Sequence, residues 1–347
     1  MLNYRLDKKI TLSVCIPTLN RAEYISETLD SITNQLQSCV EIVIVDGGST
    51  DNTESIIKEY QEKFESIRYF KKSISNNFPS NEGFDRDCSE SVELATGDYC
   101  WLMTDDDLIQ PDAINIILEK ISERYELIIL NSQIANKDIS EVLLNKRPDI
   151  NSDQIYNQNL HDWNSFAGKI GNHITFVGAV VIKRKHWLER NKSQYFGTGF
   201  VHVGVIFQES FEGKILVMSE PLVIIRYGNA HWSGRAFKIW MYDWPKLIWS
   251  FNSLSDEAKL NITFQKPWEK FSVLLRERAL GNYSITQFNQ YIRKVKLPFI
   301  YNLVAKMIAI IPRRPLYYLA ILFIILSSRN IELNKFRLNE SWNRGNV

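Results

Sequence analysis

The sequence predicts an α/β fold in which a mostly parallel sheet is flanked by helices and followed by a helical C-terminal extension. Between residues 10 and 132, short β-branched apolar runs alternate with stretches of helical periodicity. This alternation is typical of strand–helix units around a parallel sheet. After about residue 235 the chain becomes helical in character and rich in aromatic and basic residues.

Five strands are expected in the alternating region, because each apolar run is short and bounded by turn residues. Their ranges are 10–16, 40–45, 66–70, 98–103 and 126–132. The intervening segments carry apolar residues at helical spacing, such as Ile25 and Leu29 in the first. The helices are expected at 21–36, 54–64, 84–95 and 111–125. Thr50 or Asp51 can cap the second helix, and Pro111 suits the first turn of the last.

The middle of the chain is less regular. Residues 135–160 are polar and predict an excursion or a flexible loop. A strand is expected at 173–184 and a helix at 201–213. The stretch 214–228 predicts two strands, broken by Glu220 and Pro221.

Composition argues against several classes of protein. The formal net charge is +1, so no global field points to nucleic acid or to an acidic partner. The N-terminal residues lack the apolar core of a signal peptide, and no apolar run is long enough to span a bilayer. The cysteines show no CxxC pair and no zinc spacing, which predicts reduced thiols in a cytosolic protein; they are Cys15, Cys39, Cys88 and Cys100.

Three loops are expected to meet at one edge of the sheet. They are 17–21 (PTLNR), 46–51 (DGGSTD) and 104–107 (TDDD), and each follows a predicted strand. Open sheets of this kind bind ligands outside the carboxyl ends of their strands. Neither a GxGxxG fingerprint nor a P-loop is present, which argues against a dinucleotide site and against P-loop ATP chemistry.

The acidic triplet Asp105, Asp106 and Asp107 has two interpretations. Aspartates favour the start of a helix through the free backbone N–H groups and the helix dipole. They also bind hard cations such as Mg²⁺, which often take one or two carboxylates and complete their shell with phosphate oxygens. A cation would offset the repulsion between neighbouring carboxylates. Asp46, at the end of another strand, can bind a base or a ribose, or belong to a plain turn.

Between residues 10 and 132 the chain resembles the family 2 glycosyltransferases, through SVCIPTLNRAEYISETLDSITNQ, VEIVIVDGGSTDNT, NEGFDRDCSESVELATGDYCWLMTDDD and PDAI, in this order and spacing. The resemblance implies the GT-A fold and an inverting transfer from a nucleotide-sugar donor. The segment GFDRD, followed by ATGDYCWLM, is most similar to the abequosyltransferase-like enzymes of bacterial O-antigen synthesis. This implies transfer of a 3,6-dideoxyhexose such as abequose from a CDP-sugar; UDP-, GDP- or dTDP-hexose donors are the alternative.

Matching positions assign roles in donor binding. The resemblance implies that Pro17 and Thr18 line the nucleotide pocket and that Asp46 binds the base. It implies that Asp105 lies beside the ribose and the diphosphate. Asp106 matches the metal-binding aspartate of the family's DxD motif, which implies Mg²⁺ or Mn²⁺ as a cofactor.

Two further positions concern the diphosphate. Asp85 and Arg86 are implied to approach the donor in the loop before the fourth strand, with Arg86 neutralising diphosphate charge. A surface ion pair of Arg86 with Asp85 or Asp87 is the alternative. Thr104 stands where the fuller motif carries its first aspartate, so the chain departs from the pattern there.

An inverting transfer needs a general base for the acceptor hydroxyl. The resemblance places this base within TGFVHVGVIFQES, where the family carries an aspartate and this chain has His202. A histidine is chemically competent because its pKa lies near neutrality, although a packed core histidine is the alternative. Glu209 is the second candidate. His231 and Arg235 are implied contacts of the diphosphate or the metal, or simply loop residues.

The resemblance also divides the chain. Residues 1–132 are expected to bind the nucleotide-sugar, 133–234 to bind the acceptor, and 235–347 to form a helical, membrane-contacting region. The apolar run 316–326 is too short to span a membrane, so we expect it either in the interface or buried as a helix. The implied acceptor is a polyprenyl-diphosphate-linked glycan. The protein is accordingly expected in the cytoplasm, bound peripherally to the inner face of the membrane.

Two other functions stay open. A sugar nucleotidyltransferase has a similar α/β architecture, but it usually carries a Gly-rich basic loop after the first strand, which PTLNRAEY is not. A nucleotide-sugar-binding scaffold protein without catalysis would keep the fold and lose the base. The intact aspartates Asp46, Asp105 and Asp106 argue against such decay, whereas His202 in place of an acid leaves room for it.

Overall fold

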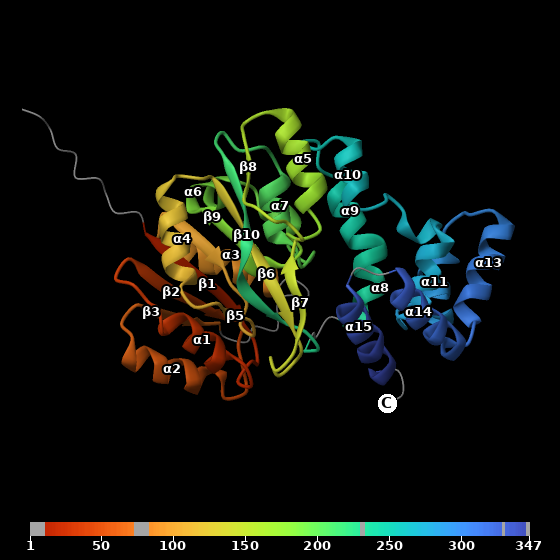
Figure 1. The fold of residues 1–347 in the computed structure, drawn as a ribbon, viewed down its shortest axis with the longest axis horizontal. Helices are drawn as coiled ribbons and strands as arrows, with labels where there is room; N and C mark the ends of the chain where they lie inside the picture. Colours follow the sequence, from red (N-terminus) through yellow and green to blue (C-terminus); the bar gives the residue numbers. More distant parts are fainter. Residues whose placement is uncertain (1–10, 73–82, 230–232, 328–329, 345–347) are drawn as a thin grey trace, which may run out of the picture. The chain divides into compact units, whose positions relative to one another are not determined.

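The computed structural model describes residues 11–72, 83–229, 233–327 and 330–344, and it confirms the α/β fold class (Figure 1). The chain packs as two units. Unit 1 comprises residues 1–133, 145–226 and 251–258, and unit 2 comprises 134–144, 227–250 and 259–347. The segment expected to bind the acceptor therefore falls mostly within unit 1.

Among the described residues, the sheet has ten strands in the order β3-β2-β1-β4-β9-β6-β10-β5, with β7 beside β6 and β8 beside β10. The strands are β1 Leu12–Thr18, β2 Val40–Asp46, β3 Ile67–Lys71, β4 Tyr99–Leu102, β5 Leu108–Ile109, β6 Leu127–Ala135, β7 Val142–Arg147, β8 Gln154–Tyr156, β9 Val180–Lys183 and β10 Ile215–Arg226. Strand β1 pairs in parallel with β2 and β4, and β2 with β3. The carboxyl ends of these strands therefore lie at one edge, as predicted.

Helices join the strands in unit 1 and make up most of the C-terminal region. The first group is α1 Ile25–Thr33, α2 Thr53–Lys63, α3 Gly83–Leu94, α4 Ala113–Ser122, α5 Leu160–Ile170, α6 Arg184–Glu189 and α7 Val201–Phe207. The second is α8 Ala236–Lys238, α9 Trp244–Trp249, α10 Asp256–Ile262, α11 Phe271–Ala279, α12 Ile285–Gln287, α13 Phe299–Ile310, α14 Arg313–Ser327 and α15 Ile331–Arg344. The predicted alternation up to residue 132 is confirmed.

Alternate residues of β1 serve the two faces of the sheet. Leu12 and Val14 are completely buried in an apolar core that includes Leu29 of α1. Cys15 faces the other side, where its thiol lies 3.6 Å from the Ser91 carbonyl of α3. Helices therefore cover both faces, and this explains why β1 is apolar along its length rather than alternating with polar residues.

Several predicted elements differ from the structure. Residues 135–160 contain β7 and β8 rather than an unstructured excursion. The stretch 214–228 holds one continuous strand, β10. It tolerates Pro221 because β8 pairs with residues 215–217 and β5 with 223–224, on either side of the proline. The helix expected at 201–213 ends at Phe207, and the strand expected at 173–184 begins at Val180.

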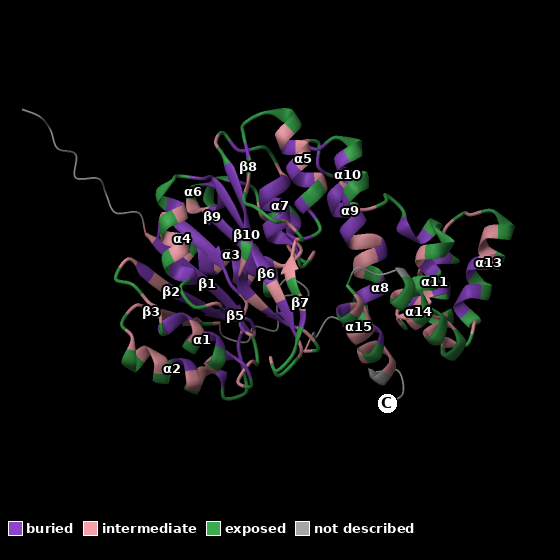
Figure 2. Ribbon diagram, viewed as in Figure 1, coloured by how far each residue is buried: buried purple, intermediate pink, exposed green. Residues whose placement is uncertain are grey.

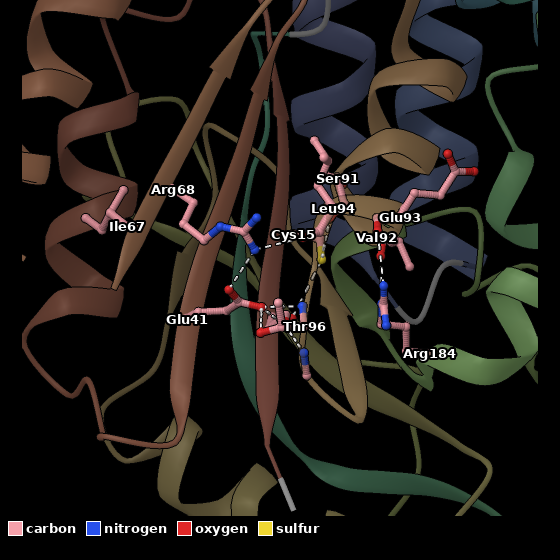
Figure 3. Close-up of polar contacts among 12 residues, drawn as sticks. Cys15, Glu41, Ile67, Arg68, Ser91, Val92, Glu93, Leu94, Thr96 and Arg184 are labelled. Carbon is pink, nitrogen blue, oxygen red and sulfur yellow. Dashed lines mark hydrogen bonds and ion pairs between the residues drawn. The ribbon is translucent and has the colours of Figure 1, made fainter. Parts of the chain in front are cut away.

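Two arginine side chains hold the C-terminal end of α3 (Figure 3). Arg68 donates to the Leu94 carbonyl at 2.7 Å, and Arg184 donates to the carbonyls of Val92 and Glu93, each at 3.0 Å. The last carbonyls of a helix lack intrahelical partners and carry the negative end of its dipole, so cations there are favourable. These contacts fix α3 and thereby position its first turn.

We expect Arg184→Met to lower the free energy of unfolding by about 2 kcal/mol, because two helix carbonyls lose charge-assisted hydrogen bonds. Urea unfolding of the full chain measures this change. Arg293→Met replaces an exposed arginine and serves as the matched control, with an expected effect below about 0.5 kcal/mol. Equal effects of the two variants would contradict the proposed role of Arg184.

Candidate functional site

The loops that follow β1 and β2 are bonded to each other. The Gly47 N–H donates to the Thr18 carbonyl at 2.9 Å, and the Asn20 N–H donates to the Ser49 hydroxyl at 2.8 Å. The Asn20 side chain accepts the Thr50 N–H at 2.8 Å. Asn20 has φ 54°, in the left-handed region that asparagine tolerates better than most residues. The expectation that these loops meet is confirmed.

Arg21 joins the acidic loop to them. Its backbone N–H donates to the Thr53 hydroxyl at 2.8 Å, its Nε lies 3.2 Å from Asp105 Oδ1, and its Nη2 lies 3.3 Å from Asp106 Oδ2. The side chains of Arg21, Asp105 and Asp106 are only 16%, 12% and 14% exposed. Two adjacent carboxylates so poorly hydrated need a compensating cation, and the guanidinium provides it.

A second arginine holds the other side of the triplet. Arg226 of β10 donates its backbone N–H to Asp107 Oδ1 at 2.7 Å and its Nε to the Asp106 carbonyl at 2.8 Å. Its Nη2 donates to Glu27 of α1 at 2.6 Å. The Thr104 hydroxyl donates to Asp107 Oδ2 at 2.5 Å. Both oxygens of the buried Asp107 carboxylate are therefore engaged in fixing the loop.

Burial governs the protonation of the triplet. It raises the pKa of Asp105 to about 7; the charge of Asp106 adds to this rise, and Arg21 opposes it. Burial, followed by the charge of Asp106, also raises the pKa of Asp107 well above its ordinary value. The structure thus holds carboxyl groups whose ionised forms are costly, an arrangement typical of functional sites.

The triplet fits a divalent cation only with help from a ligand. Across residues 11–72, 83–229, 233–327 and 330–344, no three His, Cys, Asp or Glu side chains are grouped to hold a metal ion. Asp106 offers the carboxylate oxygens that Mg²⁺ and Mn²⁺ prefer, and such ions bind one or two carboxylates together with substrate phosphates. Within the described residues, a cation would therefore be held by Asp106 together with a bound diphosphate.

Asp46 ends β2, opposite Thr18 of the neighbouring strand β1, and is completely buried. Its Oδ1 accepts the N–H groups of Gly48 and Ser49 at 2.9 and 2.7 Å, and its Oδ2 accepts the Tyr69 hydroxyl at 2.6 Å. These bonds shape the turn after β2. The expected contact between Asp46 and a base stays a prediction, because the carboxylate serves the protein's own backbone in this structure.

Asp85 and Arg86 lie in the first turn of α3, within the helix expected at 84–95 rather than in the loop before it. The buried Asp85 carboxylate accepts the N–H groups of Gly199 and Val201 at 2.8 and 3.0 Å, and thus caps the start of α7. Burial raises the pKa of Asp85 to about 6. The Arg86 guanidinium lies over the Phe196 ring, 4.8 Å from its centroid. Asp85 therefore holds backbone rather than facing a diphosphate.

Gly47 allows α3 to approach the loop after β2. A Cβ at Gly47 would lie 2.7 Å from Asp87 Oδ2, closer than real Cβ contacts permit. Asp87 also pairs with Lys72 at 2.7 Å. The double glycine of DGGSTD thus has a packing reason at its first position.

His202 is the second residue of α7 and is only 1% exposed. Its Nε2 donates to the Ile174 carbonyl at 2.8 Å, so the lone pair is on Nδ1, which is buried and has no hydrogen-bond partner within the described chain. Burial lowers the pKa of His202 to about 4. Asp85 attaches the start of α7 to α3, yet the immediate surroundings of the imidazole are those of a packed core histidine.

The remaining candidates are Glu209, Arg235 and His231. Glu209 lies beyond the C-terminal end of α7, is 68% exposed and pairs with Arg190 at 3.3 Å. Glu209 thus forms a surface ion pair in this structure, and its role as an alternative base stays a prediction. Arg235 belongs to unit 2. His231 lies outside the described residues.

Sequence reasoning missed Arg21 and Arg226. Arg21 carried a signal, because it ends the first of three loops expected to converge and is a cation beside predicted carboxylates. Arg226 carried none, since its partner Glu27 is 199 residues away along the chain.

Comparisons of sequence agree with this geometry. The profile of glycosyl transferase family 2 matches residues 13–187. The chain is 30% identical over 280 residues to abequosyltransferase RfbV of Salmonella typhimurium, a match that covers 77% of this chain and 80% of that protein. It is 28% identical over 123 residues to the GalNAc(5)-diNAcBac-PP-undecaprenol beta-1,3-glucosyltransferase of Campylobacter jejuni, covering 35% and 38%.

Two solved structures share the fold. S. aureus TarS 1–349 in complex with UDP superposes with a TM-score of 0.51 at 16% identity, covering 97% of this chain and 92% of that one. The mannosyltransferase PcManGT from Pyrobaculum calidifontis, in complex with GDP-Man and Mn²⁺, gives 0.53 at 14% identity, covering 97% and 87%. The expected GT-A fold is confirmed.

We expect His202 to make the protein sensitive to acid. The pKa of His202 is about 4 in the folded chain and about 6.5 when unfolded, so the unfolded state binds the proton first. Stability is complete above about pH 6.5 and falls as the pH drops toward 4, by up to about 3 kcal/mol. Urea unfolding at pH 7.5 and pH 4.5 measures the loss of unfolding free energy between the two pH values. This loss should be smaller for His202→Leu than for the unmodified protein. The exposed His161→Leu is the control, and identical losses in both variants would contradict this expectation.

Proposed function

The chain belongs to glycosyl transferase family 2, and from that premise we propose that it performs an inverting transfer of a sugar from a nucleotide-sugar donor to a lipid-linked oligosaccharide. The observation that carries the proposal is the bridge from Arg21 to Asp105 and Asp106, at the edge where the loops after β1, β2 and β4 meet. A polar site at the carboxyl edge of such a sheet is where a nucleotide binds.

The proposed donor is a CDP-3,6-dideoxyhexose such as CDP-abequose. Its support is the 30% identity to an abequosyltransferase along 80% of that relative's length. A UDP-, GDP- or dTDP-hexose is the alternative, and the structural neighbours hold UDP and GDP-Man. Pro17 and Thr18 would line the nucleotide pocket, with Asp46 holding the adjoining turn.

Asp106 would hold Mg²⁺ or Mn²⁺, which supplies positive charge to the leaving diphosphate when bound. Arg21 keeps the carboxylates of Asp105 and Asp106 in place, and Arg226 binds the backbone carbonyl of Asp106. This preorganisation matters because charge on the leaving group grows in the transition state, and groups already in position stabilise it without reorganising.

His202 is the proposed general base. The Ile174 carbonyl binds Nε2–H, which fixes the tautomer and leaves the Nδ1 lone pair to accept a proton. As the acceptor oxygen bonds to the anomeric carbon, the bond from that carbon to the diphosphate breaks and the hydroxyl proton passes to Nδ1. Because His202 is buried, the acceptor must first gain access to Nδ1.

The proposed acceptor is a polyprenyl-diphosphate-linked glycan at the cytoplasmic face of the membrane, in O-antigen or related surface polysaccharide synthesis. The support comes from two relatives, whose names refer to abequose transfer and to an undecaprenol-linked acceptor. A nucleotide-sugar-binding scaffold without catalysis is the alternative, and turnover distinguishes the two.

We expect Asp106→Asn to abolish transfer and to weaken donor binding at least about tenfold when Mn²⁺ is present. Calorimetric titration with CDP-, UDP-, GDP- and dTDP-sugars, with and without Mn²⁺, measures both the nucleotide preference and the cation's contribution. Asp112→Asn is the matched control, because Asp112 is exposed and its left-handed φ of 62° suits asparagine. Donor affinity that ignores Mn²⁺ in the unmodified protein would overturn the cation's role.

We expect His202→Gln to lower kcat by about 100-fold or more while leaving the donor Kd unchanged, because only proton transfer is lost. Steady-state rates with a lipid-linked acceptor, together with donor titration, separate the two quantities. His161→Gln is the control. An unchanged kcat would remove His202 as the base, and a parallel loss of donor affinity would show a structural role instead.

A further inference from the structure

Helices α13 and α14 carry a broad apolar surface. Eleven of their large apolar side chains are between 47% and 80% exposed; they are Phe299, Ile300, Leu303, Met307 and Ile310 on α13, and Tyr318, Leu319, Leu322, Phe323, Ile325 and Leu326 on α14. Exposed stretches run along both helices in Figure 2. We call this set the α13–α14 apolar surface. Exposed apolar patches that are larger than those of a typical monomer mark interaction sites.

Helix α13 presents one apolar face to the core of unit 2 and a second apolar face to solvent. On α13, Ala305, Ile308 and Ala309 are buried in the apolar core of unit 2. The exposed residues of α13 recur at helical spacing on the side away from that core. Packing within unit 2 therefore holds the helix and leaves an apolar face to be covered by something else.

The helix lengths bear on how deeply this surface could enter a membrane. No single helix in the described part of the chain is long and apolar enough to cross a membrane, whereas α13 and α14 pass that test only together, with a bend of 90° between them. Helices of 12 and 15 residues extend about 18 and 22 Å, short of the roughly 30 Å of a hydrocarbon core. An apolar pair with this bend suits one leaflet.

The positive charge in the surrounding sequence favours an anionic partner for this surface. From residue 278 to 331 the chain has eight lysines and arginines and no aspartate or glutamate. Five of these cations are exposed: Arg293, Lys294, Lys296, Lys306 and Arg314. Arg278 and Arg313 instead donate to the carbonyls of Ile311 and Ser341. Exposed cations bordering an apolar face complement anionic headgroups above acyl chains.

We propose that the α13–α14 apolar surface inserts into a single leaflet of an anionic lipid membrane, with the neighbouring lysines and arginines on the headgroups. The inference rests on the proposed function, since a lipid-linked acceptor is itself held at the membrane surface. To the expected interfacial run 316–326 it adds helix α13, the lipid class and the depth of insertion. A second copy of the chain is the competing occupant that the test must separate.

Flotation of the full chain with vesicles tests the proposal. Vesicles of phosphatidylcholine containing about 30% phosphatidylglycerol should bind the protein, and pure phosphatidylcholine should bind it at least about fivefold less. Leu319→Glu combined with Phe323→Glu should reduce binding by about tenfold or more, because charge is costly among acyl chains. Lys306→Gln with Arg314→Gln should weaken binding to the anionic vesicles alone. Leu160→Glu, at a 71% exposed leucine of unit 1, is the control and should bind normally.

Two outcomes would overturn the inference. One is an unmodified protein that stays unbound with anionic vesicles. The other is a dimer in sedimentation velocity that the Leu319 and Phe323 replacements dissociate, without vesicle binding, which would assign the surface to a second copy. Donor titration separates this inference from the proposed function. A protein that binds the donor but not the vesicles would contradict only the membrane inference. A protein that binds the vesicles but not the donor would contradict only the proposed transferase function.

Discussion

The guanidinium of Arg21, placed between the carboxylates of Asp105 and Asp106, is the contact on which the edge of the sheet depends. Without it, two poorly hydrated carboxylates would repel each other, and a buried charge lacking a partner is far more costly than a paired one. Because the Arg21 N–H also binds Thr53, the residue that neutralises the acidic loop is the residue that joins it to the other two. Charge balance and loop geometry are therefore one constraint.

That constraint extends through α3 to α7. Arg68 and Arg184 fix the C-terminal carbonyls of α3, and at the opposite end Asp85 accepts two N–H groups at the start of α7. Helix α3 is thus fixed to the sheet at one end and to the start of α7 at the other, where His202 is the second residue of α7. The raised pKa of Asp85 shows that burial of this carboxyl is costly, and the N–H groups it accepts offset that cost.

Sequence patterns predicted the features that depend on residues close together in the chain, such as strands and turns. The apolar run of β2 and the turn residues after it located Asp46 correctly, and family motifs located the acidic loop. The patterns failed where partners are distant: Pro221 could be judged only with β8 and β5 in view, and Arg226 only with Glu27. They also failed for Asp85, because its position near the other loops gave no hint that its oxygens serve α7. Burial of His202 is likewise invisible to spacing alone.

Charge is distributed differently in the two regions of the chain, and the overall composition does not show this difference. In unit 1 Arg21 is paired with two poorly exposed aspartates, so these charges fix geometry and project little field. Between residues 278 and 331 eight cations have no acid among them, so this segment does project a field. Salt screens that field beyond about 8 Å at physiological ionic strength. A formal net charge of +1 averages these regions, so it excludes a strong global field but does not describe the local charge of the C-terminal helices. The distribution of charge along a chain, rather than its sum, decides which surfaces it can bind.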